Sequence, residues 1–189
     1  GWEVHNSTYK CGRRPWKEIA EDVRGYINSI VNKGERVSFV CHSLGGILIR
    51  YCIEKGLDCY IDKVVTISTP HEGAYWVNDI PFGRELGYYL FGVGLVNSLM
   101  DLGSIEKLPS LSPYHVLCVT TNKPKSFNNP LSWYVGKHIK GDSDGFVGLS
   151  GQTLVGSKTV NFHLDHLWSV KDKKLIRCVL NYLNYGGTL

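Results

Sequence analysis

The sequence lacks any run that would span a membrane and any segment that marks separate domains. Its longest uncharged apolar stretch, GYYLFGVGLVNSLM at 87–100, has 14 residues, whereas a transmembrane helix needs about 20. No secretory signal, repeat, linker or low-complexity segment is present. We therefore expect a single domain over residues 1–189, in a cytoplasmic or membrane-peripheral location.

Metal and disulfide signatures are also missing. The six cysteines include no C-x-x-C pair, so we interpret them as buried free thiols. No two of the seven histidines stand four residues apart, and Asp142 and Asp144 lack the further oxygen ligands of a calcium loop. We expect no metal and no cofactor. The net charge of +4 is mild and has no dense basic stripe, which argues against nucleic-acid binding.

What the sequence does contain is alternation of short apolar runs with helical patterns. Strands are expected at 2–7, 37–41, 64–68, 116–120 and 160–162, and helices at 16–31, 44–55 and 175–183. Pro15 opens the first helix and glycines end all three. This order predicts an α/β fold, with a mostly parallel sheet flanked by helices on both faces. Active sites of such sheets lie beyond the carboxyl ends of the strands.

Ser43 occupies one of these strand ends, in VSFVCHSLGGILIR at 37–50. A sharp strand-to-helix turn projects a serine oxygen and presents backbone N–H groups at a helix N-terminus. Gly45 supplies one of the small residues that the turn needs, and Cys41 stands where a second glycine is usual. A literal G-x-S-x-G occurs instead around Ser143, but no apolar strand precedes it and Asp142 and Asp144 flank it. We favour Ser43 as a nucleophile.

Four segments carry a resemblance to a known family. VSFVCHSLGG followed by VVTISTPHEG resembles the lipase and esterase branch of the α/β-hydrolase fold, and SDGFVGLSGQ and LDHLWSV resemble its acid and histidine loops. The resemblance implies that Asp144 orients the base and His166 is the general base. Asp142 and His163 are their rivals. Leu44 would donate its N–H to the oxyanion, while His42 packs on a neighbouring strand.

The resemblance also implies what this sequence does not match. The second oxyanion donor of the family precedes a strand like WEVHNSTY, so we expect an N-terminally shortened sheet and impaired catalysis. Residues 76–108 form an expected helical lid, rich in apolar side chains that suit an acyl group. His71, Tyr89 and Phe91 are the expected substrate-binding residues, and peripheral membrane contact would run through this lid.

The function expected from this resemblance is hydrolysis of a carboxylic ester, lipid-like or with a hydrophobic acyl group, through an acyl-enzyme. Acyl transfer or thioester cleavage by the same residues is one alternative. A catalytically impaired binding module is another. The expected partner is a small-molecule or lipid ester; the oligomeric state is not indicated.

Overall fold

A computed structural model describes residues 1–9, 14–73, 84–85, 87–88, 92–124 and 130–187 of the chain. Its strands are β1 (Arg36–His42), β2 (Tyr60–Ile67), β3 (His115–Thr121) and β4 (Lys158–Phe162). Its helices are α1 (Trp16–Ile30), α2 (Leu44–Lys55), α5 (Val93–Met100), α6 (Leu102–Ile105), α7 (Pro130–Gly136) and α8 (Lys173–Tyr185).

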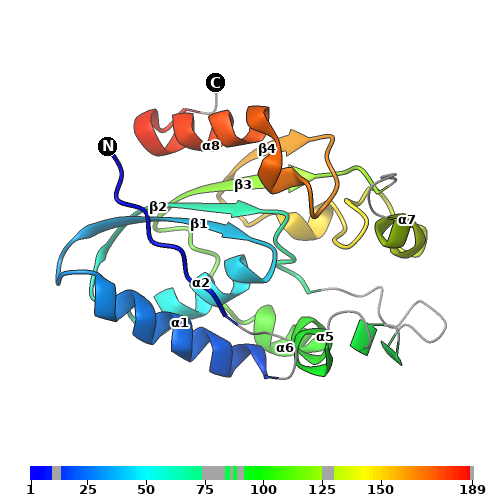
Figure 1. Cartoon of the computed structure of the whole chain (residues 1–189), viewed down its shortest axis with the longest axis horizontal. Coiled ribbons are helices and arrows are strands. Elements are labelled where there is room, and N and C mark those ends of the chain that lie inside the picture. The colour runs from blue at the N-terminus through cyan, green and yellow to red at the C-terminus, as the bar shows by residue number, and fades with distance from the viewer. Residues whose placement is uncertain (10–13, 74–83, 86, 89–91, 125–129, 188–189) are drawn as a thin grey trace.

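The four strands form one parallel sheet in the order β1-β2-β3-β4. Helices α1 and α2 cover one face and α8 covers the other (Figure 1). The predicted α/β class and the parallel sheet with helices on both faces are therefore confirmed. All four strands end at the same edge, toward α7, and the residues that follow them share that edge.

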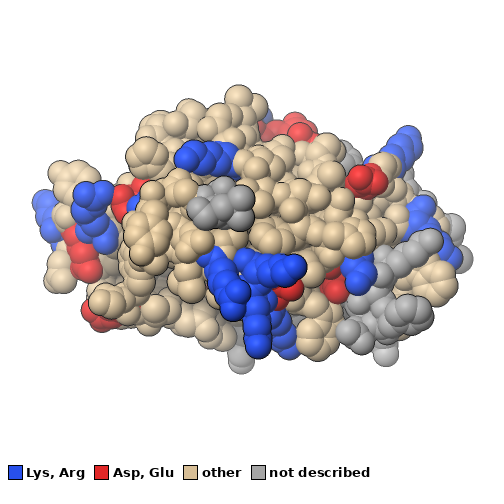
Figure 2. Space-filling view, turned by 90° about the horizontal axis from the view of Figure 1, so that it is seen from above, with Lys and Arg blue, Asp and Glu red and all other residues tan. Residues whose placement is uncertain are grey.

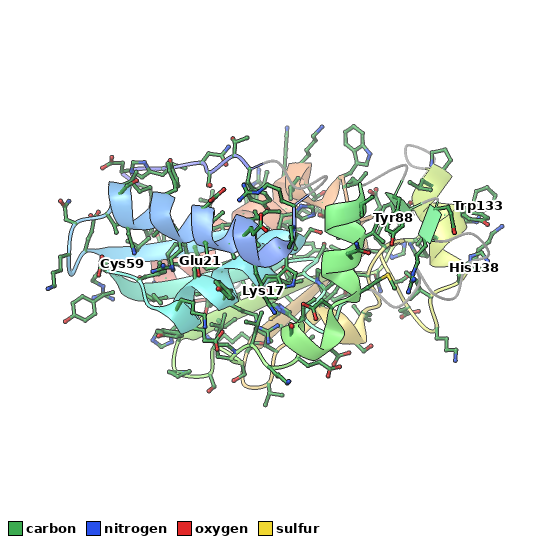
Figure 3. All side chains as sticks on the ribbon, turned by 90° about the horizontal axis from the view of Figure 1, so that it is seen from below. Lys17, Glu21, Cys59, Tyr88, Trp133 and His138 are labelled. Carbon is green, nitrogen blue, oxygen red and sulfur yellow. The ribbon has the colours of Figure 1, made fainter. Side chains whose placement is uncertain are left out.

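The helices form where apolar periodicity predicts them, because each buries one stripe. Helix α1 turns Trp16, Ile19, Ala20 and Ile27 inward, and its opposite side carries exposed Lys17 and Glu21 (Figure 3). Helix α2 is buried almost all round, since it lies between α1 and the sheet. Helix α8 is capped at Asp172 and ends at left-handed Gly186, and its stripe packs on β2 and β3.

The predicted strand at 2–7 is wrong. Within the described residues this segment pairs with no strand, and β1 forms the edge of the sheet. The alternating apolar side chains of Trp2 and Val4 do not pack on an apolar face of the sheet, as their exposed fractions of 51% and 80% show. Alternation shows that a segment can be a strand, but pairing needs a neighbour within hydrogen-bonding distance.

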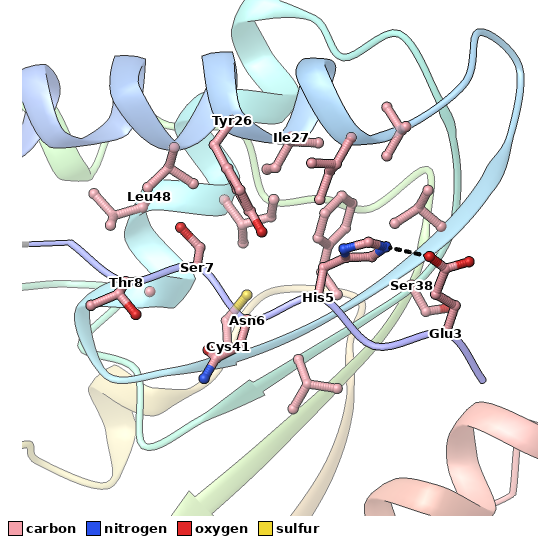
Figure 4. Close-up of a pocket in the computed structure, with 18 of the residues that line it drawn as sticks. Glu3, His5, Asn6, Ser7, Thr8, Tyr26, Ile27, Ser38, Cys41 and Leu48 are labelled. Carbon is pink, nitrogen blue, oxygen red and sulfur yellow. Dashed lines mark ion pairs between the residues drawn. The ribbon is translucent and has the colours of Figure 1, made fainter.

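A hollow of about 620 Å³ separates this segment from the sheet. Residues 2–3 and 5–9 line one side of it, and β1 and α1 line the other (Figure 4). His5 pairs with Glu3 over 3.1 Å along its rim. The hollow borders the turn after β1, since His42 and Gly45 line it, but Ser43 does not.

The surface carries mixed charge. On the face shown in Figure 2, lysines and arginines lie in several separate groups among uncharged residues, with acidic residues between them. At the far end of the sheet, α7 presents Trp133 and His138 follows it (Figure 3). Lys137 lies 4.6 Å from the Trp133 ring centroid. No described helix is long and apolar enough to cross a bilayer.

Candidate active site

Ser43 stands between β1 and α2 with a positive φ of 53° and a ψ of −124°. Non-glycine residues seldom adopt this conformation, and they do so where the surrounding structure fixes it. Here the Ser43 N–H donates to the Ile67 carbonyl at the end of β2, over 2.9 Å. Helix α2 begins at the next residue, Leu44, where a helix start leaves backbone N–H groups without intrahelical partners. The Ser43 carbonyl accepts from the Gly46 N–H.

Close packing between the first turn of α2 and the loop after β2 supports the backbone turn at Ser43. A Cβ built on Gly46 would lie 2.3 Å from Thr69 Oγ1, so only glycine fits where the first turn of α2 meets the loop after β2. That loop contains His71, which is buried. Its Nε2 lies 3.1 Å from Thr66 Oγ1 and its carbonyl accepts from Arg50. These contacts favour a structural role for His71, and substrate contact by it stays a prediction.

His166 reaches both Ser43 and Asp144. Its Nδ1 lies 2.8 Å from Asp144 Oδ2, and its Nε2 lies 2.9 Å from Ser43 Oγ. Because a carboxylate can only accept, Nδ1 carries the proton and Nε2 accepts from the serine hydroxyl. Three side chains separated by up to 123 positions in the sequence thus form one line of hydrogen bonds.

Asp144 is fully buried in a loop that its own carboxylate organises. Oδ1 accepts from the N–H groups of Phe146 and Val147, over 3.0 and 2.8 Å. Oδ2 accepts from Thr121 Oγ1 as well as from His166. Burial alone would raise the Asp144 pKa, but the charge and hydrogen bond of His166 and the two backbone donors lower it below its usual value. The carboxylate is therefore held ionised.

The rival residues lie elsewhere. Asp142 is exposed and uses its carbonyl to accept from Leu149. Ser143 is buried, and its hydroxyl has no hydrogen-bond partner among the described residues. His163 is exposed, with Nδ1 3.1 Å from Asn122 Oδ1. None of the three joins the line of hydrogen bonds around His166.

Two residues in this site were missed by the sequence analysis as partners of the triad candidates. His42 Nε2 lies 2.9 Å from the His166 carbonyl, so His42 must donate there. Burial lowers the His42 pKa to about 4, with a further contribution from nearby His166, and the ring is neutral when it does so. Thr121 is the second. No sequence motif marks either contact, because each joins residues that are far apart in the sequence. Of the predicted substrate-binding residues, Tyr89 and Phe91 lie outside the described residues.

The described residues contain no group of three or more His, Cys, Asp or Glu that could hold a metal ion. Arg50 is the one buried cation among the residues of α2. It donates to the carbonyls of His71, Ile105, Leu108 and Pro109. Burial lowers its pKa to about 10. These bonds tie the segment after α6 to the helix that follows Ser43.

Comparison with known proteins gives one family match. Residues 9–91 match the model of a family described as "Putative serine esterase (DUF676)". The match includes Ser43 and ends before Asp144 and His166. No curated protein sequence is similar enough to count as a match.

Solved structures show the fold. The mature lipase BlEst2 of Bacillus licheniformis is 18% identical, with a TM-score of 0.56; 81% of this chain and 68% of the lipase are covered. The metagenomic carboxyl esterase MGS0156 is 16% identical, with a TM-score of 0.60 and coverage of 85% and 54%. The phospholipase PlaB from Legionella pneumophila is 15% identical, with a TM-score of 0.54 and coverage of 78% and 36%. The chain has the α/β-hydrolase fold of these enzymes.

Proposed function

We propose that this α/β-hydrolase-fold chain is a serine ester hydrolase that cleaves a carboxylic ester with a hydrophobic acyl group. One observation carries the proposal: the hydrogen bonds from Ser43 to His166 and from His166 to Asp144, at 2.9 and 2.8 Å. A serine hydroxyl needs such a base, and the base needs such an orienting group. The family description of residues 9–91 supports the same chemistry.

The reaction follows from the hydrogen-bond directions. Ser43 Oγ attacks the ester carbonyl while its proton passes to His166 Nε2, and Asp144 stabilises the imidazolium that forms. The Leu44 N–H, at the start of α2, donates to the oxyanion of the tetrahedral intermediate. His166 then gives its proton to the leaving alcohol. Water, deprotonated by the same nitrogen, releases the acid from the acyl-enzyme.

The substrate class rests on the segment 76–108, which we assign as a lid within a single domain of residues 1–189. Two of its described helices belong to apolar clusters that include neighbours of Ser43 and His166. Ile105 of α6 packs in one cluster with Leu44, and Val96 of α5 packs in another with Phe146. Phe146 in turn lies with its ring centroid 5.5 Å from that of His166. Apolar side chains close to Ser43 and His166 would suit the acyl group of a hydrophobic ester.

A fluorophosphonate probe tests the proposal, because it forms a covalent adduct only with an activated serine. We expect labelling of the wild-type chain at Ser43, together with hydrolysis of p-nitrophenyl butyrate. Ser43→Ala should lose both, and Ser143→Ala, at the literal G-x-S-x-G, should keep both. A chain that takes up no probe would instead be the non-catalytic binding module.

Labelled protein that does not turn over the ester would favour the acyltransferase alternative, and an alkyl alcohol or amine acceptor would then release the acyl group. The slow turnover expected from a single oxyanion donor, roughly 10²–10³ below a two-donor site, stays a prediction. A burst of nitrophenol followed by a slow steady state would agree with it.

A further inference from the structure

Three neighbouring strands each deliver a hydroxyl side chain to the same edge of the sheet. Ser43 follows β1, Ser68 follows β2, and Thr121 ends β3. Ser43 and Ser68 both have a positive φ, of 53° and 51°. Each also donates its N–H to the next strand, Ser43 to Ile67 and Ser68 to Val119. Of these three hydroxyls, the reaction steps described above use only that of Ser43, and they assign no role to the other two.

These two hydroxyls form a chain that ends on Asp144. Thr121 Oγ1 lies 2.8 Å from Asp144 Oδ2, the same oxygen that accepts from His166. Ser68 Oγ lies 2.6 Å from Thr121 Oγ1. Thr121 has a single hydroxyl proton and the carboxylate can only accept. Thr121 therefore donates to Asp144, and Ser68 donates to Thr121.

The surroundings leave these side chains little freedom. Ser68 and Thr121 are fully buried. Gln152 fixes the backbone of Thr121 on both sides, since its Oε1 accepts from the Thr121 N–H over 2.7 Å and its Nε2 donates to the Thr121 carbonyl over 2.9 Å. Ser68 has a backbone conformation that is rare for a residue with a side chain. The end of a strand can form without these Gln152 hydrogen bonds and without a rare backbone conformation. Both restrict the directions in which the Thr121 and Ser68 hydroxyls can point.

We infer that Ser68 and Thr121 are positioning residues for Asp144, and that their hydroxyl chain limits how strongly this carboxylate holds the His166 imidazolium. This inference rests on the proposed function. The positive end of each hydroxyl dipole points toward the carboxylate, so it stabilises the charge of Asp144 and opposes a second positive charge beside it. His42 also bears on the pair, since its ring centroid lies 5.0 Å from that of His166. Asp165, buried and next to His166 in the chain, accepts from the N–H groups of Leu167 and Trp168.

Thr121→Val tests the inference, since valine keeps the shape of threonine and removes the hydroxyl. Without the hydroxyl dipole, Asp144 stabilises a positive charge beside it more strongly, so the acid limb of the kcat/KM profile should move to higher pH. This gain is opposed by the loss of the hydrogen bond that positions Asp144. We expect the positioning effect to be larger, so kcat should fall about tenfold, as for loss of one hydrogen bond to a charged group. Thr121→Ser restores the hydroxyl and should return kcat to within about threefold of wild type.

Thr120→Val is the matched control. Thr120 is the preceding residue of the same strand, is also buried, and donates to Asn161 Oδ1 over 3.0 Å. The Thr120→Val variant therefore also loses one hydroxyl hydrogen bond, but this hydroxyl does not bond to Asp144. Ser68→Ala gives a second perturbation that leaves Thr121 in place, and it should shift the acid limb in the same direction by less.

A readout without catalysis separates this inference from the proposed function. The Nδ1–H NMR signal of His166 reports its hydrogen bond to Asp144. It should move in Thr121→Val and stay constant in Thr120→Val, whether or not the chain hydrolyses esters. The same chemical shift in wild type, Thr121→Val and Ser68→Ala would overturn the hydroxyl chain. Equal losses of kcat in Thr121→Val and Thr120→Val, with no shift of the acid limb, would likewise reduce Thr121 to a packing residue.

Discussion

The contact between Gly46 and Thr69 makes a strong prediction about stability. A Cβ at position 46 would lie 2.3 Å from Thr69 Oγ1, 2.5 Å from its Cγ2 and 2.9 Å from its Cβ. Thr69 is fully buried and precedes Pro70, so it has little room to withdraw. Gly46→Ala must therefore push the loop after β2 away from α2, or tilt the start of α2 itself.

Two effects of opposite sign set the magnitude. Overpacking of a core costs about 1–3 kcal/mol, and contacts this short place Gly46→Ala near the upper end. Alanine in place of glycine inside a helix returns about 1 kcal/mol. The net loss should be about 2 kcal/mol. Gly25→Ala is the matched control, because Gly25 lies in α1 with no atom within 4 Å of a built Cβ. It should gain up to about 1 kcal/mol.

Urea unfolding followed by tryptophan fluorescence measures both variants. We expect them to differ by about 3 kcal/mol, the sum of the two effects. Gly46→Ala combined with Thr69→Ala removes the two shortest contacts and should recover part of the loss. If Gly46→Ala proved as stable as Gly25→Ala, then α2 and the loop after β2 would not be packed as described, and the fixed turn at Ser43 would lose its support.

Three further predictions concern the buried polar groups. Asp144→Asn should lower kcat by about 10³–10⁴ through loss of the oriented base, while Asp142→Asn, next to it but exposed, should leave the initial rate of ester hydrolysis unchanged. The His42 pKa falls from 6.5 to about 4 on folding. Between these pH values the unfolded chain therefore binds one more proton, and the free energy of unfolding should drop as pH falls from 6.5 to about 4. His42→Gln should flatten this pH dependence in urea titrations, and an unaltered pH dependence would contradict the burial of His42. Arg50→Met should cost about 3 kcal/mol, because its carbonyl partners lose their donor. Arg36→Met, at a side chain 76% exposed, should cost under about 1 kcal/mol in the same thermal melts; equal losses would show that Arg50 is not a clamp.

Local patterns predict most of this fold, because the signals that define a helix or a buried strand lie within one segment. The stripe from Trp16 to Ile27 is enough to predict α1. The apolar run at Val64–Ile67 predicts the buried end of β2, while its polar start at Tyr60 is missed because it is exposed. The segment 2–7 fails for the opposite reason: its alternation is correct for a strand, but pairing depends on a neighbour that no local pattern reports.

The candidate site divides in the same way. Ser43 can be found from the junction of β1 and α2, since the strand, the turn and the helix are contiguous. Asp144 and His166 are named by resemblance to a family, and the structure brings them together. Thr121 and His42 cannot be found from sequence: their bonds join positions 23 and 124 apart, and a threonine at the end of a strand has no special pattern. These two contacts depend on where the residues lie in the fold, and the residue types alone do not reveal them.

The buried polar atoms of Asp144 and His166 all have hydrogen-bond partners. Asp144 has donors on both oxygens, and His166 has partners on both ring nitrogens and on its carbonyl. Among the described residues, the buried side-chain atoms without a hydrogen-bond partner belong to Ser38, Thr69, His71 and Ser143. An unpaired buried polar group can turn when its surroundings change, whereas a fully paired one is fixed. The hydrogen bonds of Asp144 and His166 are thus complete in the chain without a substrate. In the reaction that we propose, only the serine proton would then have to move, because the groups that receive it are already in place.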